Sequence, residues 1–288
     1  GGLFSHGTCF GAGGSCGSGM GSTDIARGWA TGKTWLRVPE TLRVVVNGRF
    51  RPGVDGKDLA LKLCRELTIA GATYMAMEYH GLEWLPLNER QTMASMAIEL
   101  GAKAGIFPPV GEAMEGFEVP EWLFVDESAT YAQTIEIDLD AQEPQVAVPH
   151  SVDAVQEVSV GFLGTCTNGR YEDMRKVAEL VRGRQIADGV RLLVTPASSQ
   201  ALQQAMADDT MATLISAGAT LTTPGCGTCM GRLQGTLGDE DVCLSTGNRN
   251  FRGRMGAPSS QIYLASPSVA AATALTGRIA DPREALND

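Results

Sequence analysis

Hydrophobic and polar residues alternate along the chain in segments that predict strands and helices in turn. Residues 41–50 (TLRVVVNGRF) alternate apolar and polar positions up to an Asn-Gly turn, which is typical of a strand. Residues 55–72 (DGKDLALKLCRELTIAGA) have helical spacing, and residues 91–109 (QTMASMAIELGAKAGIFPP) predict a second helix that Gly and Pro close. Residues 128–157 are extended, acidic and interrupted by Pro, so we predict that they connect two lobes.

The second half of the chain repeats one order of elements. Residues 157–183 (EVSVGFLGTCTNGRYEDMRKVAELVRG) predict a strand, a turn and a helix, and residues 189–209 predict the same order. Residues 214–231 and 239–251 add two strands that end in loops. This repetition predicts an α/β fold of parallel or mixed sheets flanked by helices, arranged in multiple lobes. Ligands of such folds bind outside the carboxyl ends of the strands.

Composition sets the size and the class of partner. With 288 residues, 43% of them hydrophobic, the chain can bury more than one core. The net charge of −10 argues against a nucleic acid or an anionic membrane as the main partner. The sequence has no apolar run of membrane-spanning length, and its first residues lack the features of a secretory signal, so we expect a cytoplasmic protein.

The cysteines carry the candidate chemistry. Their number, seven, is odd and favours reduced thiols over a disulfide framework. The patterns around Cys64 and Cys243 indicate structural positions in a helix and a strand. Cys226 and Cys229 are three residues apart in a loop of Gly, Pro and Thr. That spacing suits a redox disulfide, a zinc site or an iron–sulfur cluster.

Loops after separate strands are expected to meet at one edge of a sheet. Cys166 follows a predicted strand and precedes a helix, whose amino end favours a thiolate. A zinc site with Cys226 and Cys229 would need a fourth ligand, for which Cys243 is available. Three thiolates alone suit a cluster with one open iron, which would act as a Lewis acid.

A further loop, residues 245–256 (STGNRNFRGRMG), holds polar and cationic side chains after another strand. Its guanidinium groups match carboxylates with two hydrogen bonds, so the loop predicts a site for a small polycarboxylate. The alternative is a solvated basic turn.

Three segments together resemble the signatures of the aconitase superfamily: GTCTNGRYEDMR, PGCGTCMG and STGNRNFRGRMG. The end of the chain, YLASPSVAAATALTGRIADPRE, resembles the end of the large subunits of 3-isopropylmalate dehydratase and its homoaconitase-like relatives. The resemblance implies an aconitase-like fold and a [4Fe–4S] cluster on Cys166, Cys226 and Cys229. It also implies that substrate carboxylates are bound by Asn248, Arg249 and Arg254.

The resemblance names three further candidates as catalytic residues, which are Ser5, His6 and Glu78. Ser5 and His6 align with an active-site segment of the family, although Phe4 and Gly7 stand where Asp and Thr are expected. Glu78, in the segment EYHG, is implied in the polar network at the open iron. Relatives carry a segment upstream of this match, so we expect a chain that is truncated relative to the family and inactive alone.

The resemblance also implies a domain division and a function. Residues 1–38 would be the remnant of a first domain, 39–127 a second domain, and 128–288 a third domain with the cluster and arginine loops. The function implied is the large subunit of an iron–sulfur hydro-lyase that isomerises a hydroxy polycarboxylate by dehydration and rehydration, in the first place 3-isopropylmalate dehydratase of leucine biosynthesis. A separate small subunit, the swivelling domain, would be its partner. Homoaconitase is the alternative, and a zinc-stabilised scaffold without catalysis is the alternative of another class.

Overall fold

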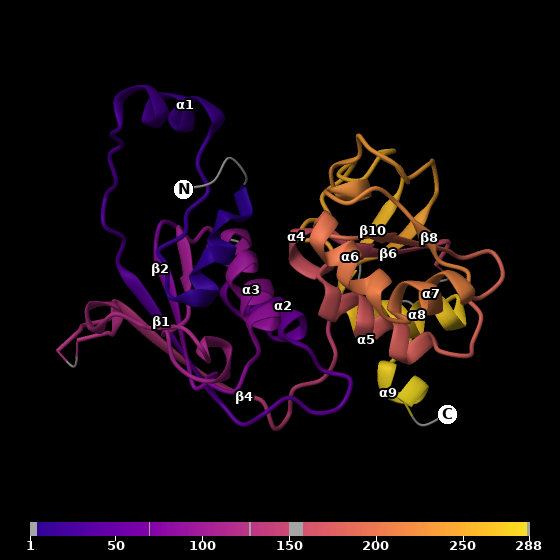
Figure 1. Ribbon diagram of the computed structural model, residues 1–288, viewed down its shortest axis with the longest axis horizontal. Coiled ribbons are helices and arrows are strands. Elements are labelled where there is room, and N and C mark those ends of the chain that lie inside the picture. The colour runs from indigo at the N-terminus through magenta and orange to yellow at the C-terminus, as the bar shows by residue number, and fades with distance from the viewer. Residues whose placement is uncertain (1–4, 69, 127, 150–157, 287–288) are drawn as a thin grey trace. The chain divides into compact units, whose positions relative to one another are not determined.

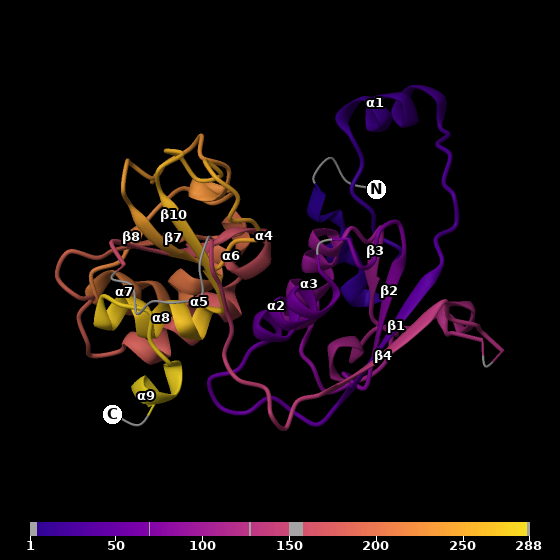
Figure 2. The same ribbon diagram turned by 180° about the vertical axis from the view of Figure 1, so that it is seen from behind.

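A computed structural model describes residues 5–68, 70–126, 128–149 and 158–286 (Figure 1). The chain divides into two compact units, unit 1 with Gly1–Phe50 and Lys62–Gln142, and unit 2 with Arg51–Leu61 and Glu143–Asp288. Each unit has its own sheet with helices packed on it (Figure 2). The α/β fold class predicted from the sequence is confirmed, whereas the three-domain division stays a prediction.

Unit 1 is built on a parallel sheet in the order β3-β2-β1-β4. Its strands are β1 (Thr41–Asn47), β2 (Ala76–His80), β3 (Ala104–Ile106) and β4 (Gln133–Asp138). Every second residue of β1, namely Leu42, Val44 and Val46, is buried, which is the alternation that the sequence predicts. The helices are η1 (Ser5–Gly13), α1 (Ser22–Thr31), the second half of α2 (Gly56–Leu67), α3 (Leu87–Met96), η2 (Ala97–Leu100), η3 (Glu112–Met114) and η4 (Glu121–Leu123).

The predicted helix over residues 91–109 is only partly correct. The α-helix ends at Met96, and η2 is followed by Gly101 in the left-handed region at φ 82°. The chain then enters β3, which pairs with β2 in parallel. Pairing with a neighbouring strand, which a local pattern does not contain, decides the conformation of residues 104–106.

Unit 2 is built on a six-stranded sheet in the order β5-β10-β9-β6-β7-β8. Its strands are β5 (Val146–Ala147), β6 (Val160–Gly164), β7 (Arg191–Thr195), β8 (Thr220–Leu221), β9 (Val242–Ser245) and β10 (Gln261–Ala265). All neighbours are parallel except β5 and β10. Every residue of β6 is buried, as expected for a strand in the middle of a parallel sheet with both faces covered.

Helices of unit 2 cover this sheet and enclose its core. They are the first half of α2, α4 (Thr165–Asn168), α5 (Tyr171–Val181), α6 (Ser199–Ala207), α7 (Thr210–Ser216), η5 (Gly227–Met230), α8 (Pro267–Thr276) and α9 (Pro282–Leu286). Apolar residues of α5 to α8 pack with Leu163, Leu192 and Val194 of the sheet. Ser198 and Ser266 begin α6 and α8 by accepting hydrogen bonds from the N–H groups of Ala201 and Val269.

The strand order places a topological switch point between β6 and β9. The chain leaves β6 toward β7 and β8 on one side, and it leaves β9 toward β10 on the other side. Connections that leave two neighbouring parallel strands in opposite directions open a crevice outside their carboxyl ends, where ligands bind in such folds. The loops that begin at residues 165 and 246 follow the carboxyl ends of β6 and β9.

Across the described part of the chain, no helix has the length and apolar character needed to cross a membrane.

Candidate active site

The Cys166 loop leaves β6 through a strained residue. Thr165, the first residue after the strand, has a φ of 77°, which is rare for a β-branched side chain. The hydroxyl of Thr165 accepts a hydrogen bond from the N–H of Thr167 and helps to hold this turn. The half-buried Cys166 lies between them. Strain of this kind persists where the surrounding structure enforces it, which is typical of functional sites.

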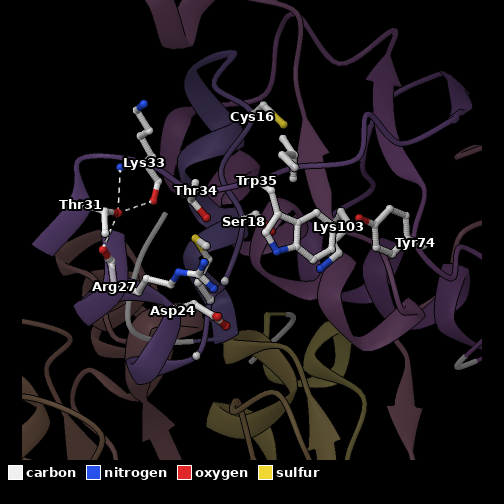
Figure 3. A pocket seen from close by; sticks show the side chains of 14 residues that line it. Cys16, Ser18, Asp24, Arg27, Thr31, Lys33, Thr34, Trp35, Tyr74 and Lys103 are labelled. Carbon is white, nitrogen blue, oxygen red and sulfur yellow. Dashed lines mark hydrogen bonds between the residues drawn. The ribbon is translucent and has the colours of Figure 1, made fainter. Parts of the chain in front are cut away.

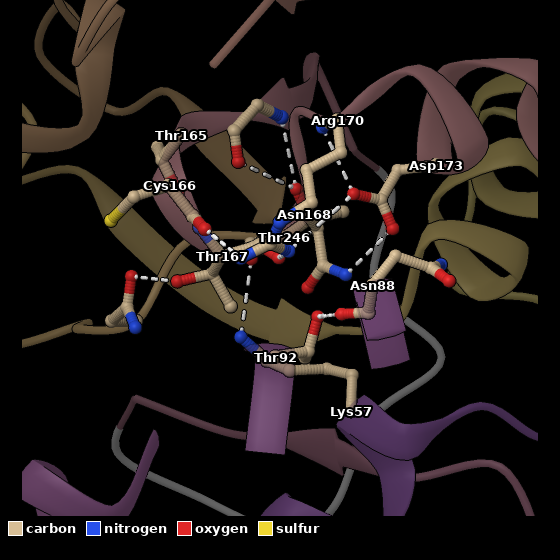
Figure 4. Close-up of polar contacts among 12 residues, drawn as sticks. Lys57, Asn88, Thr92, Thr165, Cys166, Thr167, Asn168, Arg170, Asp173 and Thr246 are labelled. Carbon is tan, nitrogen blue, oxygen red and sulfur yellow. Dashed lines mark hydrogen bonds and ion pairs between the residues drawn. The ribbon is translucent and has the colours of Figure 1, made fainter. Parts of the chain in front are cut away.

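The start of α5 fixes the carbonyls of the same loop. The Arg170 guanidinium donates to the carbonyl oxygens of Cys166, at 2.5 Å, and of Thr167 (Figure 4). The N–H of Arg170 donates to the Asp173 carboxylate at 3.0 Å, and the Asn168 amide donates to the same carboxylate at 3.1 Å. The Cys166 loop is therefore held by the first turn of α5.

The loop after β9 is hydrogen-bonded to the Cys166 loop. Thr246 donates its N–H to the carbonyl of Phe162 at 2.9 Å, and its hydroxyl accepts from the N–H of Gly164 at 3.0 Å. The Thr167 hydroxyl donates to the side-chain oxygen of Asn248 at 2.5 Å. Asn248, which is buried, is thus held beside the residue that follows Cys166.

The loop with the CxxC sequence needs a glycine between its cysteines. Gly227 has a φ of 50°, and a Cβ added there would lie 2.3 Å from the hydroxyl oxygen of Thr195 at the end of β7. The N–H of Cys229 donates to the carbonyl of Cys226 at 3.1 Å. Cys226 is exposed as a residue, but its thiol is partly buried, and this burial raises the pKa of the thiol. The nearby Cys229 raises the pKa further, whereas the positive charge of Arg254 lowers it.

The CxxC loop lies against the arginine loop. Arg254 lies with Nη2 at 3.8 Å from the sulfur of Cys229, and a Cβ added at Gly247 would lie 3.8 Å from the same sulfur. The Nε of Arg254 is buried and has no hydrogen-bond partner among the described residues. Arg249 is half-buried in the same loop. The structure therefore brings together the cysteine loops and the carboxylate-binding candidates at one edge of the sheet.

Cys243 lies at the opposite end of the same strands. It is fully buried in β9, pairs in register with Val160 at the start of β6, and has a pKa raised by burial. Val160 and Gly164 are four residue steps apart, a distance of about 13 Å along β6. Ligands of one zinc ion each lie about 2.3 Å from the metal, so Cys243 cannot join Cys166 on one zinc. No group of three His, Cys, Asp or Glu side chains in the described residues is arranged to hold a single metal ion.

Glu78 belongs to a polar cluster of unit 1. Its Oε1 lies 2.6 Å from Nε2 of His80 and accepts a hydrogen bond from the Tyr131 hydroxyl at 2.9 Å. The guanidinium of Arg43 lies 5.1 Å from the centre of the Tyr131 ring. Burial opposes ionisation of Glu78, but the hydrogen bonds from His80 and Tyr131 outweigh it and hold the pKa of the carboxyl below its usual value.

The other two catalytic candidates lie at the start of the chain. His6 is buried, with its Nε2 at 2.9 Å from the carboxylate of Glu99 in η2. The side chain of Ser5 lies outside the described residues.

The lowered pKa of Glu78 predicts a stability that depends on pH. The ionised carboxylate stabilises the folded chain above its usual pKa of 4.5, and this contribution is lost as the pH falls through the lower folded value. Glu78→Gln should therefore lower the free energy of unfolding at pH 7 by about 1.5 to 3 kcal/mol, the scale of hydrogen bonds to a charged group. The difference should shrink below pH 4 in urea unfolding. Glu66→Gln, at an exposed position, is the control. A loss of unfolding free energy in Glu78→Gln that stays constant from pH 7 to pH 3 would contradict the lowered pKa of Glu78.

A separate hollow of about 700 Å³ lies in unit 1 (Figure 3). It is lined by the cations Arg27, Lys33 and Lys103 and by the rings of Trp35 and Tyr74. Trp35 is 77% exposed, so the hollow is open to solvent. None of the site residues predicted from the sequence lines it, and the chemistry of the cysteine loops lies elsewhere.

Several side chains that hold the site were not identified from the sequence. The spacing of Arg170 and Asp173 at a helix start is that of a cap and could have indicated their contact. The hydrogen bonds of Thr167 and Thr246 join residues about eighty positions apart and leave no local signal. The contacts of Lys57 also leave no local signal, because its ammonium donates to the distant carbonyls of Thr246 and Gly247.

Comparison with known proteins identifies the family of the chain. A profile of the aconitase family (aconitate hydratase) matches residues 2–160 and 152–277. The chain is 55% identical to the homoaconitase large subunit of Thermus thermophilus, over 97% of this chain and 70% of that protein. It is 54% identical to the 3-isopropylmalate dehydratase large subunit of Herpetosiphon aurantiacus, over 98% of this chain and 69% of that protein. It is 51% identical to 3-isopropylmalate dehydratase large subunit 1 of Deinococcus radiodurans, over 97% of this chain and 67% of that protein. The chain belongs to the aconitase family.

Proposed function

We propose that this chain is the large subunit of an iron–sulfur hydro-lyase, with 3-isopropylmalate as its substrate. The observation that carries the proposal is the meeting of the two cysteine loops with the arginine loop at the switch point of unit 2. A relative named homoaconitase and one named 3-isopropylmalate dehydratase have nearly equal identity to the chain, 55% and 54%, so homocitrate is the second candidate.

Cys166, Cys226 and Cys229 would hold a [4Fe–4S] cluster. When bound, the cluster supplies a Lewis acid for the hydroxyl that leaves the substrate. Each thiolate of such a cluster binds a different iron, so its cysteines lie farther apart than the ligands of a single ion. A donor set of three soft thiols suits a cluster, and the Arg254 guanidinium beside the Cys229 sulfur, with a buried Nε that has no partner among the described residues, suits an anion next to it.

Asn248, Arg249 and Arg254 would bind the substrate carboxylates. The Asn248 oxygen accepts from the Thr167 hydroxyl, which orients the side-chain amide of Asn248. Nη2 of Arg254 lies 3.8 Å from the Cys229 sulfur, and the buried Nε has no hydrogen-bond partner among the described residues, so a carboxylate oxygen can accept from it. These side chains orient the acid so that its hydroxyl and the adjacent C–H lie in fixed positions.

We assign acid–base roles to Ser5, His6 and Glu78. Glu78 is ionised at neutral pH because its pKa is held low, so it can accept hydrogen bonds or a proton. A small subunit would supply the remaining groups, since the relatives are named large subunits. Elimination of water from the hydroxy acid and its return to the neighbouring carbon then complete the isomerisation.

The test is calorimetric binding of hydroxy acids to the iron-loaded chain, followed by turnover after a small subunit is added. Isopropylmalate and homocitrate should bind, and lactate, which has one carboxylate, should not. Growth of alkene absorbance in the ultraviolet with one of the two acids then identifies the substrate. Equal binding of lactate and the two larger acids would contradict the proposal.

A further inference from the structure

Lys57 is a buried cation at the start of α2. Its side chain belongs to the part of α2 that lies in unit 2, and its relative exposure is 0%. The ammonium donates to the carbonyl of Thr246 at 3.1 Å and to the carbonyl of Gly247 at 2.5 Å (Figure 4). Burial of an ammonium is unfavourable unless hydrogen bonds replace its water. The two acceptors come from one loop and directly precede Asn248 and Arg249.

The other side of this loop is held by different partners. The N–H of Thr246 donates to Phe162, and the N–H of Gly247 donates to the Ser245 hydroxyl at 3.0 Å. A trans peptide bond sets its C=O and N–H in opposite directions. A Gly247 carbonyl that points to Lys57 therefore turns the N–H of Asn248 away from Lys57. The ammonium thus fixes the main chain from which the side chains of Asn248 and Arg249 extend.

We propose that Lys57 is a positioning residue for substrate binding, because its ammonium holds the carbonyls of Thr246 and Gly247 and so sets the orientation of Asn248 and Arg249. The inference rests on the proposed function for its ligand, a small polycarboxylate. The buried positive charge also attracts an anion at this loop more strongly than an exposed charge would.

Lys176 provides a matched control. Its ammonium pairs with the Asp55 carboxylate at 2.6 Å, and Asp55 also accepts from the Ser268 hydroxyl at 3.0 Å. This pair joins α5 to the residues that precede α2, close in sequence to Lys57. Lys176→Met removes a lysine and its ion pair from unit 2 but leaves the hydrogen bonds from Lys57 to the carbonyls of Thr246 and Gly247. Lys57→Met removes those hydrogen bonds, so the two variants separate the loss of a lysine from the loss of the loop contacts.

The experiment is hydrogen exchange followed by mass spectrometry on the full chain. In Lys57→Met, the amides of residues 245–250 should exchange about tenfold faster than in the parent, while those of β7 keep their rate. Lys176→Met should leave the 245–250 amides close to the parent rate. Unchanged exchange of these amides in Lys57→Met would overturn the inference. If Lys57→Met does not fold, Lys57→Gln replaces it in the same comparison. Glutamine keeps a hydrogen-bond donor but is uncharged and shorter than lysine.

A second readout connects the loop to its ligand. The dissociation constant of tricarballylate, an unreactive tricarboxylate, should rise about tenfold in Lys57→Met, as expected for lost charge-assisted contacts, and should return toward the parent value in Lys57→Arg. Faster exchange with unchanged tricarballylate binding would overturn the positioning role. If the parent itself does not bind tricarballylate, the proposed function fails, whereas the exchange result still reports on whether Lys57 holds the loop.

Discussion

Replacing any one of Cys166, Cys226 or Cys229 by Ser should abolish iron binding by the chain. A serine hydroxyl is a harder ligand than a thiolate and binds a cluster iron weakly, and a cluster held by three protein ligands does not tolerate the loss of one. The measurement is iron content and visible absorbance after anaerobic reconstitution.

Cys64→Ser is the control for this series. Cys64 lies in α2 and is half-buried. Its replacement should leave the iron content and the brown colour unchanged. A Cys226→Ser variant with as much iron as the parent would show that the CxxC loop does not bind the cluster.

Arg249→Lys should weaken binding of a polycarboxylate by about 1.5 to 3 kcal/mol, the scale of a charge-assisted hydrogen bond. This corresponds to a rise of about ten- to hundredfold in the dissociation constant. Lysine keeps the charge but cannot form the paired hydrogen bonds of a guanidinium with a carboxylate. Calorimetric titration of the iron-loaded protein with tricarballylate measures the change.

Arg252→Lys tests whether the effect is specific to Arg249. Arg252 lies in the same loop, but it is exposed and donates through Nε to the carbonyl of Pro258. Its replacement should leave the dissociation constant within about twofold, because exposed charges contribute little. Equal losses for the two variants would mean that the loop attracts the anion only by its overall charge.

Local patterns predicted most of the fold of unit 2. The apolar run at 158–164 and the helical spacing from Tyr171 correspond to β6 and α5. The same patterns placed Cys166 after a strand, and the rule for parallel sheets predicted that its loop would lie near other carboxyl-end loops. The position of Cys243 in a strand was also correct, and its register with Val160 removes it from a zinc site.

The contacts that orient the site could not be predicted in this way. Lys57 and Gly247 are 190 positions apart, and the helical pattern around Lys57 is that of an ordinary amphipathic helix. The left-handed conformation of Thr165 contradicts the preference of a β-branched residue, so only the surrounding structure can enforce it. The strand at residues 104–106 likewise depends on the pairing of β3 with β2.

The central claim is that Cys166, Cys226 and Cys229 of unit 2 hold one iron–sulfur cluster beside the arginine loop. The most direct test is the amount of iron, acid-labile sulfide and zinc bound per chain after anaerobic reconstitution and desalting. We predict about four irons and four sulfides per chain, no zinc, and a broad visible absorbance. A colourless protein that retains zinc, or that binds no iron, would contradict the account.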